Sequence, residues 1–198
     1  MSAVVATATD TTTVPSPFRL RPLTRGERAP IVEVFDGLSQ ESRYRRFHAA
    51  MPRLSDQALD HLARVDGRRH VAVVAEVPDP FAPRGWRAIG VARIIATGVA
   101  LGELAIEVVD GWQGRGVGRQ LLEAVRDAAA RRGFAEITGS ILVGNDAMLG
   151  LMRRVFPDTR VTSDGHTWEV RAGVPLAPRR PRRRPVLGRP SPARPGSR

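Results

Sequence analysis

The chain has 198 residues, no cysteine and a formal net charge of +11 at pH 7. Its length suits one α/β domain with a proper core, and the lack of cysteine excludes disulfides, zinc–thiolate sites and an acyl-cysteine intermediate. No apolar run approaches the ~18 residues of a membrane span and the N-terminus lacks the basic start of a signal peptide, so we expect a cytoplasmic protein.

The first third of the chain predicts one strand followed by three helices. Apolar and basic residues alternate over residues 18–23, which predicts an edge strand. Ser39 and Ser55 have the short hydroxyl side chain that favours a helix N-cap. The three expected helices cover residues 29–38, 40–48 and 56–65.

The middle of the chain predicts a long antiparallel hairpin and a third buried strand. Residues 71–77 are almost continuously apolar, and residues 78–85 contain three prolines, which predicts a loop. Residues 86–96 form the partner strand. The run 104–109 is apolar and β-branched except for Glu107, which is typical of a buried strand.

A glycine-rich loop and an amphipathic helix follow this strand. Apolar residues recur at helical spacing from Val117, and Gly133 is placed to end the helix. The free amides and the dipole at a helix N-terminus favour an anion, and glycines let a phosphate approach the backbone. The chain has no lysine, which excludes a P-loop, and its G-x-G-x-G spacing does not fit the dinucleotide fingerprint.

The last expected elements are a strand, a helix and a hairpin. The strand covers residues 135–143, and the helix runs from Asn145 to about residue 155. Two short strands, 159–163 and 166–171, flank Asp164-Gly165, which predicts a type I′ turn.

The positive charge is concentrated at the C-terminus. Residues 171–198 hold nine arginines and no acid, whereas residues 1–170 hold 22 arginines against 20 acids. Such a segment cannot bury enough apolar area to fold alone. We therefore divide the chain into a disordered leader (1–17), one domain (18–171) and a disordered Arg/Pro-rich tail (172–198). The tail could bind nucleic acid or another acidic partner, or it could be merely solvated.

The segment Gln113-Gly114-Arg115-Gly116-Val117-Gly118 matches the pattern Q-x-x-G-x-G/A, and Ile106-Glu107-Val108 precedes it. This unit resembles the acetyl-CoA pyrophosphate site of the GNAT superfamily of N-acetyltransferases. The alternative is a glycine turn that binds nothing. The resemblance implies an α/β fold with a mixed, mostly antiparallel sheet, in which the strands ending at Val109 and Val143 splay apart and admit acetyl-CoA.

The resemblance also implies roles for individual residues. Glu103 lies ten residues before Gln113, where many protein acetyltransferases of the superfamily place the general base, although it could be only a solvated surface carboxylate. Glu107 shares its face of the strand and is a second candidate base, or a structural partner of an arginine. The backbone N–H of Val108 would hold the thioester oxygen. The residues expected at the cofactor are Ile106, Val108, Gln113, Gly114, Arg115, Gly116, Val117, Gly118, Arg119, Asn145 and Met148.

The sequence departs from the family pattern at one position of this site, and it lacks the residue spacing of a metal site. Many members of the superfamily carry a tyrosine seven residues after the asparagine, as a general acid, but this chain has Met152 there. Met148 and Leu151 instead resemble the N-x-x-M-x-x-L form of the protein acetyltransferase branch. The four histidines show no metal-ligand spacing, so we expect no metal.

A second resemblance concerns the segment from Leu38 to Phe47, which matches LS-x-x-S-x-Y-x-RF. This pattern is similar to a segment of bacterial protein lysine acetyltransferases that walls the acceptor side of the site. The alternative is an ordinary amphipathic helix with Tyr44 and Phe47 in the core. We therefore expect an acetyl-CoA-dependent N-acetyltransferase that acts on a protein lysine. The alternatives are a small amine such as an antibiotic or polyamine, or a non-catalytic CoA-binding sensor or adaptor.

Overall fold

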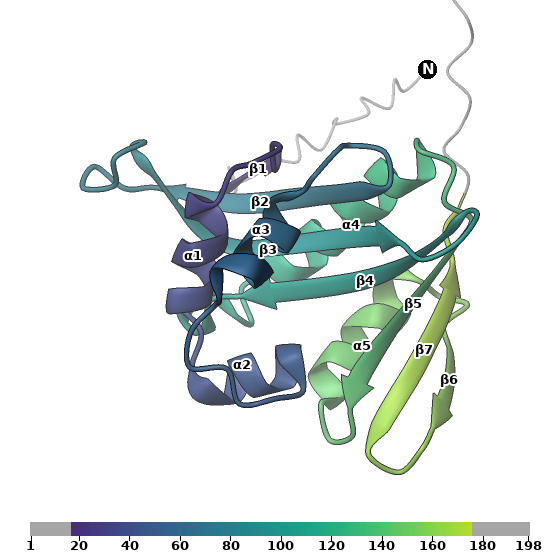
Figure 1. The fold of residues 1–198 in the computed structure, drawn as a ribbon. Coiled ribbons are helices and arrows are strands. Elements are labelled where there is room, and N and C mark those ends of the chain that lie inside the picture. The colour runs from purple at the N-terminus through teal and green to yellow at the C-terminus, as the bar shows by residue number, and fades with distance from the viewer. Residues whose placement is uncertain (1–16, 176–198) are drawn as a thin grey trace, which may run out of the picture.

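The computed structural model describes residues 17–175. Within that range, strands and helices follow the predicted order and form a mixed α/β fold (Figure 1). The elements are β1 Arg19–Pro22, α1 Ala29–Asp36, α2 Gln40–Phe47, α3 Asp56–Ala63, β2 His70–Pro78, β3 Trp86–Ala96, β4 Leu101–Val108, a 3-10 helix Asp110–Trp112, α4 Val117–Ala130, β5 Glu136–Leu142, α5 Asp146–Val155, β6 Arg160–Ser163 and β7 Thr167–Gly173.

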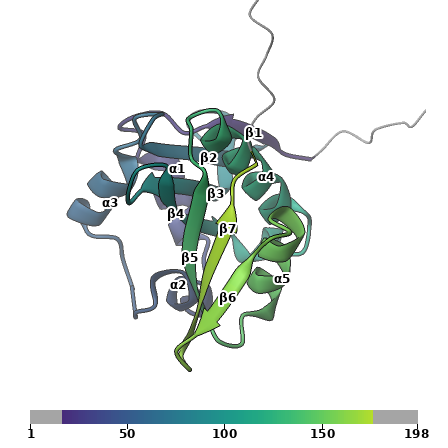
Figure 2. The ribbon, with the colours of Figure 1, turned by 90° about the vertical axis from the view of Figure 1, so that its right-hand side faces the viewer.

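The described strands form one seven-stranded sheet in the order β1-β2-β3-β4-β5-β7-β6. All neighbours are antiparallel except β4 and β5, which are parallel. Figure 2 shows α1, α2 and α3 on one face of this sheet and α4 and α5 on the other. The expected GNAT-like sheet is therefore confirmed, with β1 at one edge.

Helices cover both faces of the central strands, and each face has its own apolar core. On one face Leu121 and Val125 of α4 have no exposed surface, and on the other Val34 of α1 is equally buried. Strands that are covered on both sides need apolar residues at every position. This is why β2 reads as a continuous apolar run rather than as an alternating one.

Local signals set several helix ends as expected. Ser39 accepts a hydrogen bond from the N–H of Ser42, and Ser55 accepts one from the N–H of Ala58, so both serines are N-caps. After α4, Gly133 has a φ of +86°, a left-handed conformation that glycine adopts without a steric cost.

The turn between β6 and β7 differs from the prediction. Gly165 has a φ of +95°, but Asp164 is not among the residues with positive φ, and a type I′ turn needs positive φ at both. Instead, the Oδ1 of Asp164 accepts hydrogen bonds from the N–H groups of His166 (2.8 Å) and Thr167 (2.7 Å). The side chain of Asp164 thus closes a three-residue loop, and the hairpin itself is confirmed.

The C-terminal boundary of the domain also lies further along than expected. β7 continues to Gly173, and Ala172 and Val174 are 2% and 5% exposed. The predicted boundary after Arg171 was therefore wrong, because alternate residues of the last strand still pack into the core. The predicted leader, apart from Pro17, and the predicted tail beyond residue 175 lie outside the described residues.

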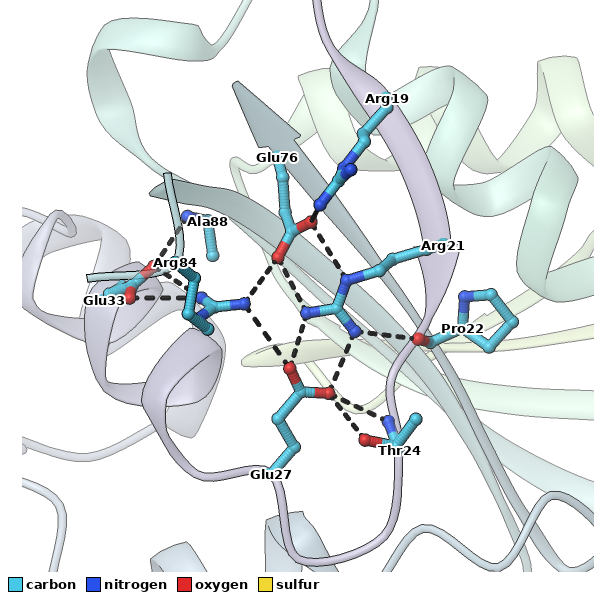
Figure 3. A network of polar contacts seen from close by, with 9 residues as sticks. All are labelled: Arg19, Arg21, Pro22, Thr24, Glu27, Glu33, Glu76, Arg84 and Ala88. Atoms are coloured by element: carbon cyan, nitrogen blue, oxygen red, sulfur yellow. Dashed lines mark hydrogen bonds and ion pairs between the residues drawn. The ribbon is translucent and has the colours of Figure 1, made fainter. Parts of the chain in front are cut away.

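A network of charged side chains fastens the edge of the sheet to α1 and to the loop between β2 and β3 (Figure 3). At its centre, the buried carboxylate of Glu76 accepts hydrogen bonds from Arg19, Arg21 and Arg84. Glu27 pairs with Arg21 in turn. Burial alone would raise the pKa of Glu76, but the three guanidinium groups outweigh it and lower that pKa to about 2. The network lies at the β1–β2 edge of the sheet.

Candidate active site

A cleft of about 910 Å³ opens where β4 and β5 part. The two strands pair only between Leu101–Glu103 and Glu136–Thr138. Gly139 of β5 follows this pairing, and a Cβ there would lie 3.3 Å from the carbonyl oxygen of Leu104. The close approach at this point therefore favours glycine, and beyond it the strands diverge. Residues of α2, β4, the loop before α4, β5 and α5 line the opening.

The glycine loop before α4 has the features of a phosphate-binding loop. Within residues 17–175, the amides from Gly114 to Arg119 have no hydrogen-bond acceptor. Gly114 and Gly116 have φ values of +71° and +82°, and no protein atom lies within 4 Å of where their Cβ atoms would be. Free amides at the start of a fourteen-residue helix, with open space before them, fit the pyrophosphate of a coenzyme.

Two amides of β4 also face the gap between the strands. In an antiparallel ladder, alternate residues bond to the partner strand. The N–H of Val109 donates to the carbonyl of Ile89 at 2.9 Å, so Ile106 and Val108 direct their N–H and C=O groups away from β3. The side-chain amide of Gln113 donates to the carbonyl oxygen of Val108 at 3.0 Å. This contact agrees with a Val108 carbonyl that points away from β3. The N–H groups of Ile106 and Val108 are thus placed to meet a ligand that enters the gap.

Glu103 lies at the point where the two strands separate. It is the last residue of β4 that pairs with β5, opposite Thr138, and its exposed side chain lines the cleft. Within residues 17–175 no arginine or histidine lies within ion-pair distance of its carboxylate, whereas Glu107 has two such partners. An exposed carboxylate without a cationic partner can take up a proton from a ligand.

Glu107 is buried between two arginines from different elements. Its Oε1 accepts from Arg93 Nη2 of β3 at 3.1 Å, and its Oε2 accepts from Arg46 Nε of α2 at 2.5 Å. Burial alone would raise the pKa of Glu107, but the two guanidinium groups outweigh it and hold the pKa below its ordinary value. Such a carboxylate is a poor proton acceptor, and the arrangement matches the structural ion pair that the sequence left open.

The helix α2 forms the wall of the cleft that faces β4. None of its residues is buried, so directed contacts rather than a core hold it in place. Ser42 Oγ accepts a hydrogen bond from Gln113 Nε2 at 3.3 Å, and Arg46 pairs with Glu107. The wall is therefore tied both to the phosphate loop and to the central strand.

Two aromatic residues of α2 have different environments. Phe47 packs against Phe35 of α1, with ring centroids 5.9 Å apart, and it lines the cleft. Tyr44 is 50% exposed, so the alternative in which both rings lie in the core is wrong. The LS-x-x-S-x-Y-x-RF pattern thus encodes a wall of the cleft.

The start of α5 forms the opposite wall. Asn145 lines the cleft and caps the helix, since its Oδ1 accepts from the N–H of Met148 at 3.3 Å. Met152, which stands where many relatives have tyrosine, is 1% exposed and also borders the cleft. The wall therefore offers apolar surface and no hydroxyl at that position.

Most of the predicted site residues meet at this cleft. The exceptions are Arg115, whose guanidinium lies over the ring of Trp112 at 5.3 Å, and Val117, whose side chain is fully buried in the core. Only the amide of Val117 could therefore contact a phosphate. Sequence reasoning missed Arg45 and His48 of the α2 segment and Arg154 of α5, which also line the cleft. Arg45 lies within the LS-x-x-S-x-Y-x-RF segment and His48 directly follows it, which could have indicated both, but nothing in the sequence marked Arg154.

The part of the chain that the structure describes contains neither a candidate metal site nor a candidate membrane-spanning helix. No group of three or more His, Cys, Asp or Glu side chains there could hold a metal ion. No helix between residues 17 and 175 is long and apolar enough to cross a membrane.

Comparisons with known proteins agree with this geometry. An acetyltransferase of Pseudomonas aeruginosa is 29% identical over 133 residues, which cover 67% of this chain and 70% of the relative. The crystal structure of the GNAT domain of S. lividans PAT has a TM-score of 0.67 at 24% identity, covering 79% of this chain and 90% of that domain. The cAMP-binding acyltransferase from Mycobacterium smegmatis has a TM-score of 0.53 at 26% identity, covering 80% of this chain and 44% of that protein.

The family model described as the acetyltransferase (GNAT) family matches residues 33–156, which is more than half of the chain. This range contains β4, the glycine loop, α4 and most of the cleft lining. The cleft, the free amides and this match agree, and the chain belongs to the GNAT family of acetyl-CoA-dependent acetyltransferases.

Proposed function

We propose that this acetyltransferase transfers the acetyl group of acetyl-CoA to the side-chain amine of a protein lysine, by direct attack in a ternary complex. One observation carries the proposal. The carboxylate of Glu103, which has no ion-pair partner among residues 17–175, lines the same cleft as the free amides of β4 and of the phosphate loop. A base, an oxyanion donor and a coenzyme site thus border one space, as acyl transfer to an amine requires.

The cleft residues suggest how the coenzyme would be held. The amides from Gly114 to Arg119 would bind its pyrophosphate, and the guanidinium group of Arg119, which lines the cleft, would add a charge-assisted hydrogen bond. Ile106 and Val108 would line its pantetheine arm from β4, with Gln113 fixing the carbonyl of Val108. Asn145 and Met148 would border that arm from α5. When bound, acetyl-CoA supplies the acyl group as a thioester with a good leaving group.

The protein groups would then act as follows. Glu103 would accept the proton of the incoming ammonium group, through a water molecule, so that the amine can attack. The N–H of Val108 would donate to the thioester oxygen as negative charge develops there. The chain contains no cysteine, so an acyl-cysteine intermediate cannot form, and direct attack by the amine needs no acyl-enzyme.

Glu107 would have a different role from Glu103. The sequence made it the second candidate for the base, and it also borders the cleft. Its carboxylate is paired on both oxygens and its pKa is lowered, which favours a structural role over proton transfer. We therefore assign the base to Glu103.

The choice of a protein lysine rests on the α2 wall. Its LS-x-x-S-x-Y-x-RF pattern is similar to that of bacterial protein lysine acetyltransferases, and Ser42, Arg46 and Phe47 from it line the cleft. Tyr44 of the same segment is half exposed and would be accessible to an acceptor protein.

Replacement of Glu103 by glutamine tests the proposal. The variant keeps the shape of the side chain but cannot accept a proton, so turnover with acetyl-CoA and a lysine peptide should fall about 10²–10³-fold near neutral pH. The loss should shrink as pH rises, because more of the amine is then already deprotonated. Glu169→Gln, an exposed carboxylate of β7 outside the cleft, is the matched control and should retain parental turnover. Parental turnover of Glu103→Gln across the pH range would remove Glu103 from the mechanism.

A further inference from the structure

Arg46 has the most exposed side chain of the ion cluster that it forms with Glu107 and Arg93. The side chains of Arg93 and Glu107 are 1% and 6% exposed, whereas that of Arg46 is 18% exposed and lines the opening. Only its Nε is engaged, by Glu107 at 2.5 Å. Within residues 17–175, neither Nη of Arg46 has an acceptor within hydrogen-bond distance. Its guanidinium is thus fixed on one edge and has unpaired donors on the other.

The cluster carries one positive charge in excess. Arg93 and Arg46 share a single carboxylate, and arginine stays protonated in proteins. A charge that is largely removed from water is costly unless an anion compensates it. Glu107 already compensates one of the two cations. The free Nη groups of Arg46, whose side chain is 18% exposed, are thus available to a further anion brought by a ligand.

Acetyl-CoA does not supply that anion at this position. Its negative charges lie on phosphates, which belong at the loop from Gly114 to Arg119, whereas its pantetheine and acetyl groups are uncharged. Arg46 pairs with Glu107, which stands in β4 between Ile106 and Val108, the two residues proposed to line the uncharged pantetheine arm. The compensating anion would thus arrive with the acceptor.

Resting on the proposed function, we infer that the site selects an amine whose carrier also bears a carboxylate, and that Arg46 binds this carboxylate while Glu103 receives the amine. A lysine with an acidic neighbour in its peptide has this chemistry. Arg45 of the same wall brings a second guanidinium group, which pairs with Glu41 at 2.5 Å.

The spacing along β4 favours lysine over a small α-amino acid. Glu103 and Glu107 are four residues apart on one strand, so their Cα atoms are separated by about 13 Å. The ε-amine of lysine stands on a four-carbon stem away from the backbone and its neighbours. In an α-amino acid, by contrast, the amine and the carboxylate share one carbon. They are therefore too close together to reach Glu103 and Arg46 at the same time.

The charges around the cleft also disfavour a polyamine acceptor. Four arginines line it: Arg45, Arg46, Arg119 and Arg154. Three acids line it, Glu103, Glu107 and Asp146. Arg45 and Arg119 also pair with Glu41 and Glu123, which lie outside the lining. The lining thus has no excess of acids that would attract a polycation.

Two capped peptides that differ only in charge test this inference. One carries lysine between two glutamates and the other carries lysine between two glutamines. We expect the glutamate peptide to be acetylated with a kcat/KM about tenfold or more above that of the glutamine peptide, the usual effect of a charge-assisted hydrogen bond. In Arg46→Gln this preference should collapse while acetyl-CoA affinity stays parental. Arg46→Lys, which keeps the charge, should restore part of it.

Arg87→Gln is the matched control, because it removes an exposed arginine of β3 that pairs only with Asp79, away from the cleft. It should retain the peptide preference. Equal kcat/KM for both peptides in the parent would overturn the inference while leaving lysine acetylation intact. So would an equal loss on both peptides in Arg46→Gln, since Arg46 would then act on the reaction and not on the acceptor.

Calorimetric titration of each peptide into the CoA-bound protein separates this inference from the proposed function. Tighter binding of the glutamate peptide to the parent, and not to Arg46→Gln, would support acceptor recognition even without turnover. Absence of turnover with both peptides would refute the proposed function alone. Equal binding of the two peptides would overturn the inference.

Discussion

Replacing Glu107 by glutamine should destabilise the protein by about 3–5 kcal/mol, the cost of breaking a buried ion pair by removing one partner. In the parent, both carboxylate oxygens accept from guanidinium groups, at 2.5 Å and 3.1 Å. Glutamine has the same shape, but it turns an amide NH₂ towards one arginine and leaves Arg93, 1% exposed, without a counter-charge. The burial of Arg93, rather than the number of contacts, sets the size of the loss.

Urea unfolding at pH 7, followed by tryptophan fluorescence, measures this loss. Glu41→Gln is a matched control, because Glu41 also pairs with an arginine at 2.5 Å but both side chains are largely exposed. It should cost less than about 1 kcal/mol. The double variant Arg93→Met/Glu107→Leu should recover part of the loss, since it removes the buried charge of Arg93 together with its partner, while Arg46 keeps its 18% exposure to water. If Glu107→Gln were no more destabilising than Glu41→Gln, the reasoning from burial would be refuted.

Three further predictions concern stability. His70 is buried and its pKa is lowered to about 4, chiefly by burial. Between pH 6.5 and 4 the unfolded chain, whose histidine pKa is about 6.5, binds a proton that the folded chain does not. As pH is lowered over this range, the free energy of unfolding should therefore fall by up to about 3 kcal/mol, and His70→Leu should lack this step. The pKa of Glu76 is about 2, so its contribution is complete above about pH 4.5 and is lost towards pH 2, a step that Glu76→Gln should lack in acid titrations. Deletion of residues 176–198 should leave the melting temperature unchanged, whereas deletion from Ala172 should lower it, because that change removes the buried Ala172 and Val174.

The sheet and the phosphate loop could be predicted because their signals are local. Continuous apolar runs identified β2 and β3, and two serines identified the N-caps of α2 and α3. Gln113 and the three glycines that follow it, placed between a strand and an amphipathic helix, identified the loop by its resemblance to the GNAT pyrophosphate site. Such features depend on residues close in the chain, so a single sequence contains them.

The ion cluster could not be predicted in the same way. Arg46 and Glu107 are 61 positions apart, and the chain has 31 basic residues that could have paired with that glutamate. Nothing in the composition distinguishes Arg93, which is buried, from the arginines on the surface. Pairing of long charged side chains depends on the packed fold, which also explains why the sequence left Glu107 open between base and structural partner.

The end of the domain was predictable but was misjudged. Val170, Ala172 and Val174 alternate with other residues at the spacing of a strand with one buried face. The run of arginines from Arg171 suggested a tail from that point. The alternation was the stronger physical signal, because each of these three side chains packs into the core.

The affinity for acetyl-CoA of two glycine variants tests the account most directly. Gly116 and Gly85 both have left-handed backbones, with φ of +82° and +67°, and no protein atom lies within 4 Å of where a Cβ would stand at either. Valine should therefore strain both positions alike, by about 1–2 kcal/mol. Only Gly116 lines the cleft, whereas Gly85 lies in the loop between β2 and β3. The account predicts, by calorimetry on folded protein, that Gly116→Val binds acetyl-CoA at least about tenfold more weakly while Gly85→Val binds it like the parent. Parental affinity in both variants would contradict the placement of the pyrophosphate on this loop.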